Sequence, residues 1–231
     1  MEKETFVYYE TLKNRYPNVR ILTWKKEFNY SAINNFAVRE AQGEYLLFLN
    51  NDVEIITENW LEEMLQLCQQ KDVGMAGAKL YYPDDTIQHA GVVVGLGGVA
   101  AHVLCKLPRD AEGYMGRLRC VQEISAVTAA CMMVKTSVFK AVGGFDEELK
   151  VAFNDIDLCM KVRKYGVKIV FTPYAELYHY ESKSRGMEDT PEKQLRFSRE
   201  VNCFRRKWER ELLKGDPYYN PNLTLNNTDC S

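Results

Sequence analysis

Apolar runs of strand length alternate with segments of helical periodicity in the N-terminal third of the chain. The runs stop at polar residues, whereas the segments between them carry apolar side chains three and four positions apart, as amphipathic helices do. We expect strands at residues 19–24, 44–49 and 73–81, and helices at residues 29–43 and 57–70. Strands and helices that alternate with short connections predict an α/β fold with a mostly parallel sheet and covering helices.

The α/β pattern resumes after a middle segment that is rich in valine and glycine. Residues 86–104 predict extended segments around a glycine loop, or a lid over a cleft. The glycines at 95–98 favour a hairpin or bulge over phosphate binding, because no clear helix follows them. Further strands are expected at 126–134 and 167–171, and further helices at 136–142, 154–166 and 191–214. Since no repeat or linker divides the chain, we expect one domain over residues 1–215 and a turn-rich tail over 216–231.

Composition narrows the class of protein without naming a function. The chain has 231 residues, 46% of them hydrophobic and 27% charged, which is typical of a soluble globular protein. A net charge of −2 gives no electrostatic case for binding nucleic acid. The basic cluster at 205–210 favours a solvated helix face over a membrane-surface patch. Seven scattered cysteines without a C-x-x-C pair, and no signal-peptide pattern, predict free thiols in a cytoplasmic protein.

The stretch from Leu46 to Asp52 is the most informative feature of the sequence. It reads Leu-Leu-Phe-Leu-Asn-Asn-Asp, an apolar run that ends abruptly in two amides and a carboxylate. Ligands of open α/β sheets bind just beyond the carboxyl ends of such buried strands. We therefore expect Asn50, Asn51 and Asp52 at the rim of a cleft, where oxygen ligands hold a divalent cation.

A second acidic cluster, Asn154-Asp155-Ile156-Asp157, opens a predicted helix. Asn154 is suited to cap that helix, and Asp157 to complete an exchange like a capping box, with a functional role for Asp157 left open. Asp155 shares a face with the apolar stripe of the helix and therefore points inward. The positive end of the helix dipole favours a carboxylate there. We interpret Asp155 as a general base for a sugar hydroxyl in preference to a cap.

Three histidines are present, and one of them lies near the acidic helix in sequence. His179 follows a strand-like run, and its imidazole is compatible with manganese, although spacing alone leaves a packed residue equally open. His89 and His102 flank the valine-rich and glycine-rich segment, and we interpret both as structural.

Two further polar segments stay ambiguous at this stage. Residues 182–186 carry two cations that suit a phosphate clamp, or simply a solvated loop. Asn34 and Asn35 form a polar helix face or approach a nucleotide, and the sequence does not choose between these.

Taken in order, these motifs resemble the family 2 glycosyltransferases of the GT-A fold. The similarity is closest to the bacterial branch of rhamnosyltransferase-like or O-antigen biosynthesis enzymes, and it covers most of the chain. The stretches that carry it are residues 34–35, 41–45, 49–52, 88–91, 143–147, 153–159, 179–182 and 216–222.

The resemblance implies an inverting glycosyltransferase of cell-envelope polysaccharide synthesis. It implies a UDP- or dTDP-sugar donor, a glycan or lipid-linked acceptor, and Mn²⁺ or Mg²⁺ as cofactor. It implies a GT-A, Rossmann-like sheet that is mostly parallel and flanked by helices. A cytoplasmic location, with peripheral association at the inner face of the membrane, fits such an acceptor.

The resemblance also assigns roles by position. Asn50-Asn51-Asp52 occupies the family's aspartate-any-aspartate motif and, with Asn34, would bind the donor. Asp52 and His179 match the metal ligands, and Asp155 matches the base that deprotonates the acceptor. The acceptor side would include Gly144, Phe145, Asp146 and Asp157.

Two departures from the family pattern change the expectation. Asn50 stands where the family has an aspartate, so one ligand charge is missing and metal affinity should depend more on the donor phosphates. The chain begins near what resembles the end of the family's first strand-helix-strand unit, so we expect the first strands to be missing from the domain. A non-catalytic sugar-nucleotide or glycan-binding module is therefore the main alternative, and a nucleotidyltransferase a weaker one.

Overall fold

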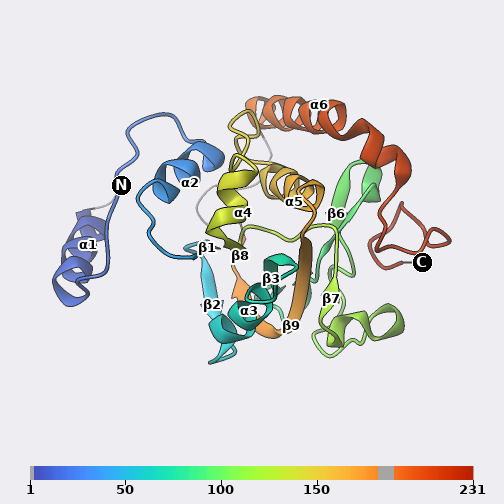
Figure 1. Cartoon of the computed structure of the whole chain (residues 1–231), viewed down its shortest axis with the longest axis horizontal. Coiled ribbons are helices and arrows are strands. Elements are labelled where there is room, and N and C mark those ends of the chain that lie inside the picture. The colour runs from blue at the N-terminus through green and yellow to red at the C-terminus, as the bar shows by residue number, and fades with distance from the viewer. Residues whose placement is uncertain (1–2, 182–189, 231) are drawn as a thin grey trace.

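The computed structural model describes residues 3–181 and 190–230, which form a central sheet flanked by helices (Figure 1). The strands of the main sheet are β1 (Tyr45–Leu49), β2 (Val53–Ile55), β3 (Val73–Tyr81), β4 (Ile87–His89), β7 (Gln122–Glu123), β8 (Cys131–Lys135) and β9 (Lys168–His179). A separate pair consists of β5 (Val92–Val94) and β6 (Ala100–His102). The helices are α1 (Lys3–Arg15), α2 (Tyr30–Val38), α3 (Trp60–Cys68), α4 (Thr136–Ala141), α5 (Asn154–Lys164) and α6 (Pro191–Lys214), with short 3₁₀ turns η1 (Leu96–Gly98) and η2 (Tyr114–Arg119).

The predicted α/β class is confirmed, but the sheet is mixed and not mostly parallel. Its order is β1-β8-β3-β9-β2, with β4 paired to β3 and β7 paired to β9. Among the described strands, β3 and β9 form the one parallel pair, and β8 runs antiparallel to both of its neighbours. β1 and β3 therefore run in the same direction with β8 between them. The chain enters β8 from loops and not from a helical crossover, so nothing imposes a parallel orientation.

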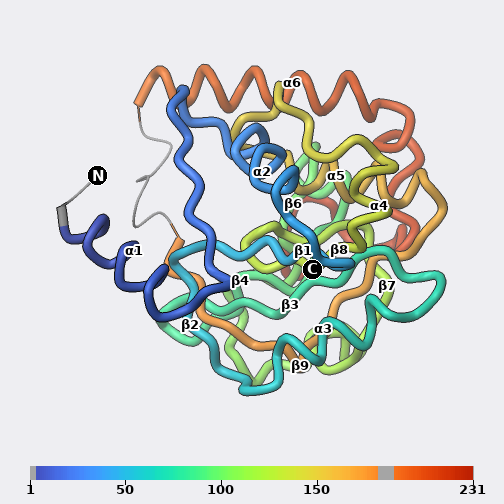
Figure 2. The backbone as a smooth tube through the Cα atoms, turned by 60° about the vertical axis from the view of Figure 1, so that its left-hand side comes forward, coloured from blue at the N-terminus to red at the C-terminus, as the bar shows by residue number. Residues whose placement is uncertain are grey.

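Both faces of the sheet are covered. On one face, α3 packs Trp60, Met64 and Leu67 against alternate residues of β3 and β9. The larger core lies on the other face, where α4 and α5 pack, and α6 lies along the outer side of α5 (Figures 1 and 2). β3 is buried at every position, which explains why its residues are apolar or small except for Lys79, whose Nζ donates to the Leu118 carbonyl.

Two strand predictions are wrong in instructive ways. Residues 19–24 form no strand and pair with no described strand, since edge strand β1 pairs with β8 alone. The strand expected at 167–171 begins at Lys168 and is only the first part of β9, which continues past Pro173 to His179. The pairing register of β3 with β9 shifts around that proline, which has no N–H to donate to a neighbouring strand. A proline in the run therefore marked an irregularity and not the end of the strand.

The middle segment forms the predicted hairpin. β5 pairs antiparallel with β6, and Gly95 takes a φ of 97° at the start of the turn between them. The C-terminal tail packs against this hairpin: Asp216 Oδ2 accepts from the Val94 N–H at 2.8 Å, and the Leu225 carbonyl accepts from Gly97. Arg205 of α6 donates to the carbonyl of Gly98. The exposed basic face of α6 thus also anchors the turn.

Cysteine state and hydropathy complete the description. No disulfide joins any of the described residues, and all seven cysteines are free, as predicted. Within residues 3–181 and 190–230, none of the helices combines the length and the apolar character that crossing a bilayer requires.

Candidate functional site

A cleft of about 960 Å³ lies beside the carboxyl end of β1 and the start of α5. Residues 50–52 cross from β1 at one edge of the sheet to β2 at the other, and they form part of its lining. Asp155 and His179 line the same cleft. The structure therefore brings together three groups that are spread over more than a hundred residues of the sequence, and each of them was predicted from its own motif.

The pairing of β2 with β9 puts Asp52 beside His179. Val53 lies opposite His179 in this antiparallel pair, and the Tyr180 N–H donates to the Asp52 carbonyl at 2.8 Å. As a result, Asp52 Oδ1 and His179 Nε2 are 3.3 Å apart. The amide of Asn50 also reaches this point, with Nδ2 at 3.1 Å from His179 Nε2.

Gln88 fixes the orientation of the His179 ring through Nδ1, the ring nitrogen that does not face Asp52. Its Oε1 lies 2.7 Å from His179 Nδ1, and its Nε2 donates to the His179 carbonyl at 3.1 Å. Nδ1 therefore carries the proton, and the lone pair of Nε2 points to Asn50 and Asp52. Burial lowers the pKa of His179 and outweighs the opposing effect of Asp52, so the imidazole is neutral, as a metal ligand must be.

The residues at this point fit a divalent cation. Asp52 Oδ1 is buried and has no hydrogen-bond donor among the described residues, which is costly for a carboxylate oxygen. Its 3.3 Å distance from His179 Nε2 is close to the roughly 3 Å that separates neighbouring ligands of an octahedral ion. In the described part of the chain, no group of three His, Cys, Asp or Glu side chains gathers to hold a metal. Asp52 and His179 would thus supply two ligands, and other oxygens must supply the rest.

Asp155 lies in the first turn of α5, and its carboxylate is fixed by backbone donors. Oδ2 accepts from the Ala129 N–H at 3.1 Å, and Oδ1 accepts from Ile156 at 2.9 Å. Tyr30 is its neighbour across the cleft: burial, and secondly the charge of Asp155, raise the pKa of that phenol. Asp155 is only partly buried, so one side of a positioned carboxylate remains open to a ligand.

The predicted capping arrangement of α5 is wrong. Phe153 occupies the N-cap position with a φ of 60°, and no side chain caps the helix there. Asn154 instead donates backwards to the Val151 carbonyl at 3.0 Å. Asp157 is fully buried and turns to α6, away from the helix end. Competing partners on α6, which the local sequence cannot reveal, thus override the capping pattern.

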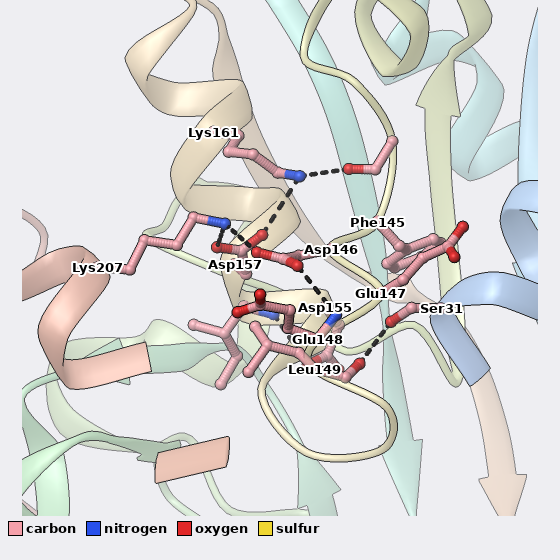
Figure 3. A network of polar contacts seen from close by, with 12 residues as sticks. Ser31, Phe145, Asp146, Glu147, Glu148, Leu149, Asp155, Asp157, Lys161 and Lys207 are labelled. Carbon is pink, nitrogen blue, oxygen red and sulfur yellow. Dashed lines mark hydrogen bonds and ion pairs between the residues drawn. The ribbon is translucent and has the colours of Figure 1, made fainter. Parts of the chain in front are cut away.

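Asp157 is the centre of a buried polar network that joins α5, α6 and the loop before α5 (Figure 3). It accepts from Trp208 Nε1 at 2.8 Å and pairs with Lys207 at 2.8 Å and with Lys161 at 3.3 Å. Lys207 also pairs with Asp146, and Lys161 donates to the Gly144 carbonyl. The network therefore fixes the loop over residues 144–153, which leads directly to Asp155.

A buried glutamate on α6 completes the support of this loop. The two carboxylate oxygens of Glu200 accept from the backbone N–H groups of Val151 and Ala152 at 2.9 and 3.0 Å. These two residues immediately precede Phe153, whose left-handed backbone sets the start of α5. Sequence reasoning missed Glu200, because nothing in a helical pattern distinguishes a charged residue that is buried by a distant loop.

None of the four residues predicted on the acceptor side lines the cleft: Asp157 lies on α5, and the other three belong to the supporting loop. Phe145 is buried against Phe48 and Phe139. Gly144 has a φ of 68°, and Asp146 pairs with Lys207. These residues hold the wall of the cleft and do not form its surface.

Neither asparagine of α2 lines the cleft. Asn34 Nδ2 donates to the Tyr30 carbonyl of its own helix at 2.9 Å. Asn35 exchanges hydrogen bonds with the backbone of Phe145, so it acts as a clamp between α2 and the loop. The basic stretch at 182–186, considered as a phosphate clamp, lies outside the described residues.

Comparison with known proteins supports the family that the sequence motifs resemble. Residues 12–200 match the model of a family described as "Glycosyltransferase like family". The chain is 52% identical over 230 residues to the uncharacterized protein y4gI of Sinorhizobium fredii, covering 99% of this chain and 25% of that protein. It is 42% identical over 215 residues to the O-antigen biosynthesis protein RfbC of Myxococcus xanthus, covering 93% of this chain and 16% of that protein. The chain thus spans a quarter or less of these relatives.

Solved structures show the same fold at low sequence identity. Mannosyltransferase PcManGT from Pyrobaculum calidifontis, in complex with GDP-Man and Mn²⁺, aligns with a TM-score of 0.60 at 14% identity, over 90% of this chain and 52% of that one. GalNAc-T7 with UDP, GalNAc and Mn²⁺ aligns with a TM-score of 0.65 at 14% identity, over 91% of this chain and 40% of that one. The fold is that of the GT-A glycosyltransferases, as the motifs predicted.

Proposed function

The chain belongs to the glycosyltransferase-like family, and from this premise we propose the reaction of its cleft. The proposed reaction transfers a sugar from a nucleoside-diphosphate sugar to a hydroxyl of a glycan or lipid-linked acceptor, with inversion at the anomeric carbon. Cell-envelope polysaccharide synthesis is the proposed context, because one relative is an O-antigen biosynthesis protein. Such an acceptor would meet a cytoplasmic enzyme at the inner face of the membrane.

The observation that carries the proposal is the shared cleft of Asp52, His179 and Asp155. Asp52 and His179 would hold Mn²⁺ or Mg²⁺ with the donor diphosphate supplying further oxygens, and the ion would stabilise charge on the departing diphosphate. Because Asn50 adds an amide and no charge, the donor phosphates would have to supply a larger share of the ligand charge. Two solved relatives of the fold carry Mn²⁺ beside a nucleotide or nucleotide sugar, which supports this assignment.

Asp155 would act as the base for the acceptor. Its carboxylate takes the proton of the acceptor hydroxyl while that oxygen attacks the anomeric carbon from the face opposite the diphosphate. The bond from the anomeric carbon to the diphosphate oxygen breaks, and the nucleoside diphosphate leaves. A single displacement needs one positioned carboxylate, and the hydrogen bond from Ala129 positions this one.

The test is donor turnover by the wild type and by Asp155→Asn with Mn²⁺, measured as released nucleoside diphosphate. A panel of UDP-, dTDP- and GDP-sugars is required, because the donors named for relatives of the fold differ. We expect turnover of one donor by the wild type, and a loss of at least about a hundredfold in the variant. Asp110→Asn, at an exposed carboxylate outside the cleft, should retain full activity. Equal turnover by Asp155→Asn and the wild type would remove Asp155 from the role.

The second candidate is a non-catalytic module that binds sugar nucleotides or glycans. Asn50 favours it, since an amide in the metal motif lowers the charge that holds a cation. Mn²⁺-dependent donor binding without turnover of any donor in the panel would select this alternative. Release of pyrophosphate from a nucleoside triphosphate would instead indicate a nucleotidyltransferase.

A further inference from the structure

A second pocket, of about 1150 Å³, lies apart from the cleft. Among the described residues, the two cavities share none of their lining. The second pocket is bounded by the end of β3, the middle of β9, the start of α3 and the chain between β6 and β7. Its volume slightly exceeds the roughly 300–1,000 Å³ that is usual for small-molecule sites, so it has room for more than one sugar unit. The proposed reaction does not use this pocket.

The wall of the pocket contains a buried cation, Lys79, which is only 4% exposed. Its Nζ donates to the Leu118 carbonyl at 3.2 Å and lies 5.4 Å from the centroid of the Tyr81 ring, and both of these residues also line the pocket. An ammonium group has three N–H donors, so two remain after the carbonyl has accepted one. Among the described residues, no carboxylate forms an ion pair with Lys79.

Glu176 lies opposite Lys79 in the β3–β9 pair but is engaged by other partners. It accepts from Tyr81 Oη and pairs with Arg109 at 3.4 Å. Arg109 lies over the Tyr81 ring, with Cζ at 4.8 Å from the centroid, and also pairs with Asp85 at 3.3 Å. Two carboxylates therefore neutralise Arg109, whereas none pairs with Lys79. Burial lowers the pKa of Lys79 against the opposing charge of Glu176, which reflects the cost of burying a cation without a partner.

The charges of the lining restrict what could pair with Lys79. A ligand with one negative group would offset the cost of the buried ammonium. Acidic residues outnumber basic ones in the lining by five to three, so a polyanion such as a nucleoside diphosphate would be repelled. A carboxylate carries a single charge, whereas a phosphate monoester carries about −1.5 to −2 at neutral pH. The lining therefore favours a carboxylate over a phosphate.

The rest of the lining suits the ring and the hydroxyls of a sugar. Tyr174 lines the pocket and is 54% exposed, and its Oη donates to the Arg119 carbonyl at 3.2 Å. This hydrogen bond fixes an exposed aromatic ring, against which the C–H face of a sugar can pack. Sugar hydroxyls both donate and accept hydrogen bonds, so they match a lining in which Arg109 donates and Asp85 accepts.

We propose that this pocket binds a hexuronic acid unit of a saccharide. Lys79 Nζ donates to the carboxylate of the sugar, and the ring of Tyr174 packs against its C–H face. The inference goes beyond the proposed reaction, because it assigns a second saccharide site away from the cleft where the transfer would occur. It needs neither a cation nor a nucleotide.

Titrations monitored by ¹H–¹⁵N correlation spectra, without Mn²⁺ or nucleotide, test the proposal. The probes are the methyl glycosides of glucuronic and galacturonic acid, the neutral methyl glucoside and methyl galactoside, and glucose 6-phosphate. We expect at least one uronide to bind roughly tenfold or more tightly than its neutral counterpart, which lacks the charged hydrogen-bond acceptor. The largest shifts on binding should be those of backbone amides around Lys79 and Tyr174, and not those of the cleft.

Two pairs of variants identify the contacts. Lys79→Met removes the ammonium and keeps an unbranched side chain, whereas Lys140→Met removes an exposed charge on α4 outside the pocket. We expect affinity for the uronide to fall roughly tenfold or more in Lys79→Met and to stay within about twofold in Lys140→Met. Tyr174→Ala should lower it roughly three- to tenfold, whereas Tyr174→Phe keeps the ring and should stay within about twofold.

The outcomes separate this inference from the proposed function. Binding of neither uronide, equal binding of the neutral glycosides, tighter binding of glucose 6-phosphate, shifts confined to the cleft, or unchanged affinity in Lys79→Met would each overturn it. If Lys79→Met does not fold, equal affinities of the two Tyr174 variants would overturn it. Because the titrations contain neither donor nor cation, their failure would leave the proposed reaction intact, and absence of donor turnover would leave the uronide site intact.

Discussion

Replacing Asp157 by asparagine removes a buried charge while it keeps the size of the side chain. Asp157 is fully buried, accepts from Trp208, and pairs with Lys207 and Lys161. An asparagine Oδ1 can still accept from Trp208, so the change isolates the two ion pairs. We expect the substitution to destabilise the protein more than any change of an exposed carboxylate.

The size of the loss in the free energy of unfolding depends on the interactions that Lys161 and Lys207 keep in the variant. Removing one partner of a buried ion pair typically costs about 3–5 kcal/mol, because the other charge stays buried. The side chains of Lys161 and Lys207 are 19% and 34% exposed, so water compensates in part. Lys207 also keeps Asp146, and Lys161 keeps a backbone carbonyl. We therefore expect a loss of about 2–4 kcal/mol in the free energy of unfolding.

Urea denaturation followed by circular dichroism and tryptophan fluorescence measures this loss. Asp72→Asn is the control, since Asp72 is an exposed carboxylate whose partner Lys168 is also paired with Glu123. The control should unfold at the midpoint of the wild type. A loss below about 1 kcal/mol in Asp157→Asn, with an unchanged slope, would refute the claim that the charge organises this network.

Three further outcomes are expected. Gln88→Leu should lower Mn²⁺ affinity about 10–100-fold in an EPR titration, because the ring of His179 loses its anchor; unchanged affinity would contradict this. Burial raises the pKa of Asp146, but the ion pair with Lys207 outweighs it and the pKa is lowered; the stabilisation is complete above about pH 4 and lost at lower pH. Asp146→Asn should therefore flatten the acid side of the stability curve, and a parallel curve would contradict the pairing. Gly77→Ala should cost about 1–3 kcal/mol by urea denaturation, since its Cβ would lie 2.3 Å from a valine methyl; a wild-type midpoint would refute this.

The elements that sequence predicted best carry their own boundary signals. β3 begins and ends at Val73 and Tyr81, the predicted bounds of a run of mostly apolar and small residues. The bounds of α6 follow from Thr190 as N-cap, proline in the first turn and Gly215 after the last residue. The strand predicted at 19–24 does not form, because a strand requires a neighbouring strand to pair with. A pattern of strand-forming residues does not reveal whether such a neighbour is present.

The residues of the candidate site likewise fall into those that the sequence predicts and those that only the structure reveals. Asp52, Asp155 and His179 could be predicted to meet, since element ends converge at one edge of an α/β sheet. Their supports could not be predicted. Gln88 lies 91 residues before His179, and Glu200 lies 48 residues after Ala152, so only the packed structure shows these contacts.

The central claim is that the cleft binds a nucleotide through a cation held by Asp52 and His179. Calorimetric titration of UDP and dTDP, each with and without Mn²⁺, tests it most directly. The account predicts binding of one nucleotide that requires Mn²⁺ and that is lost in Asp52→Ala and in His179→Ala. Binding that is independent of Mn²⁺, binding that survives both substitutions, or no binding of either nucleotide would contradict it.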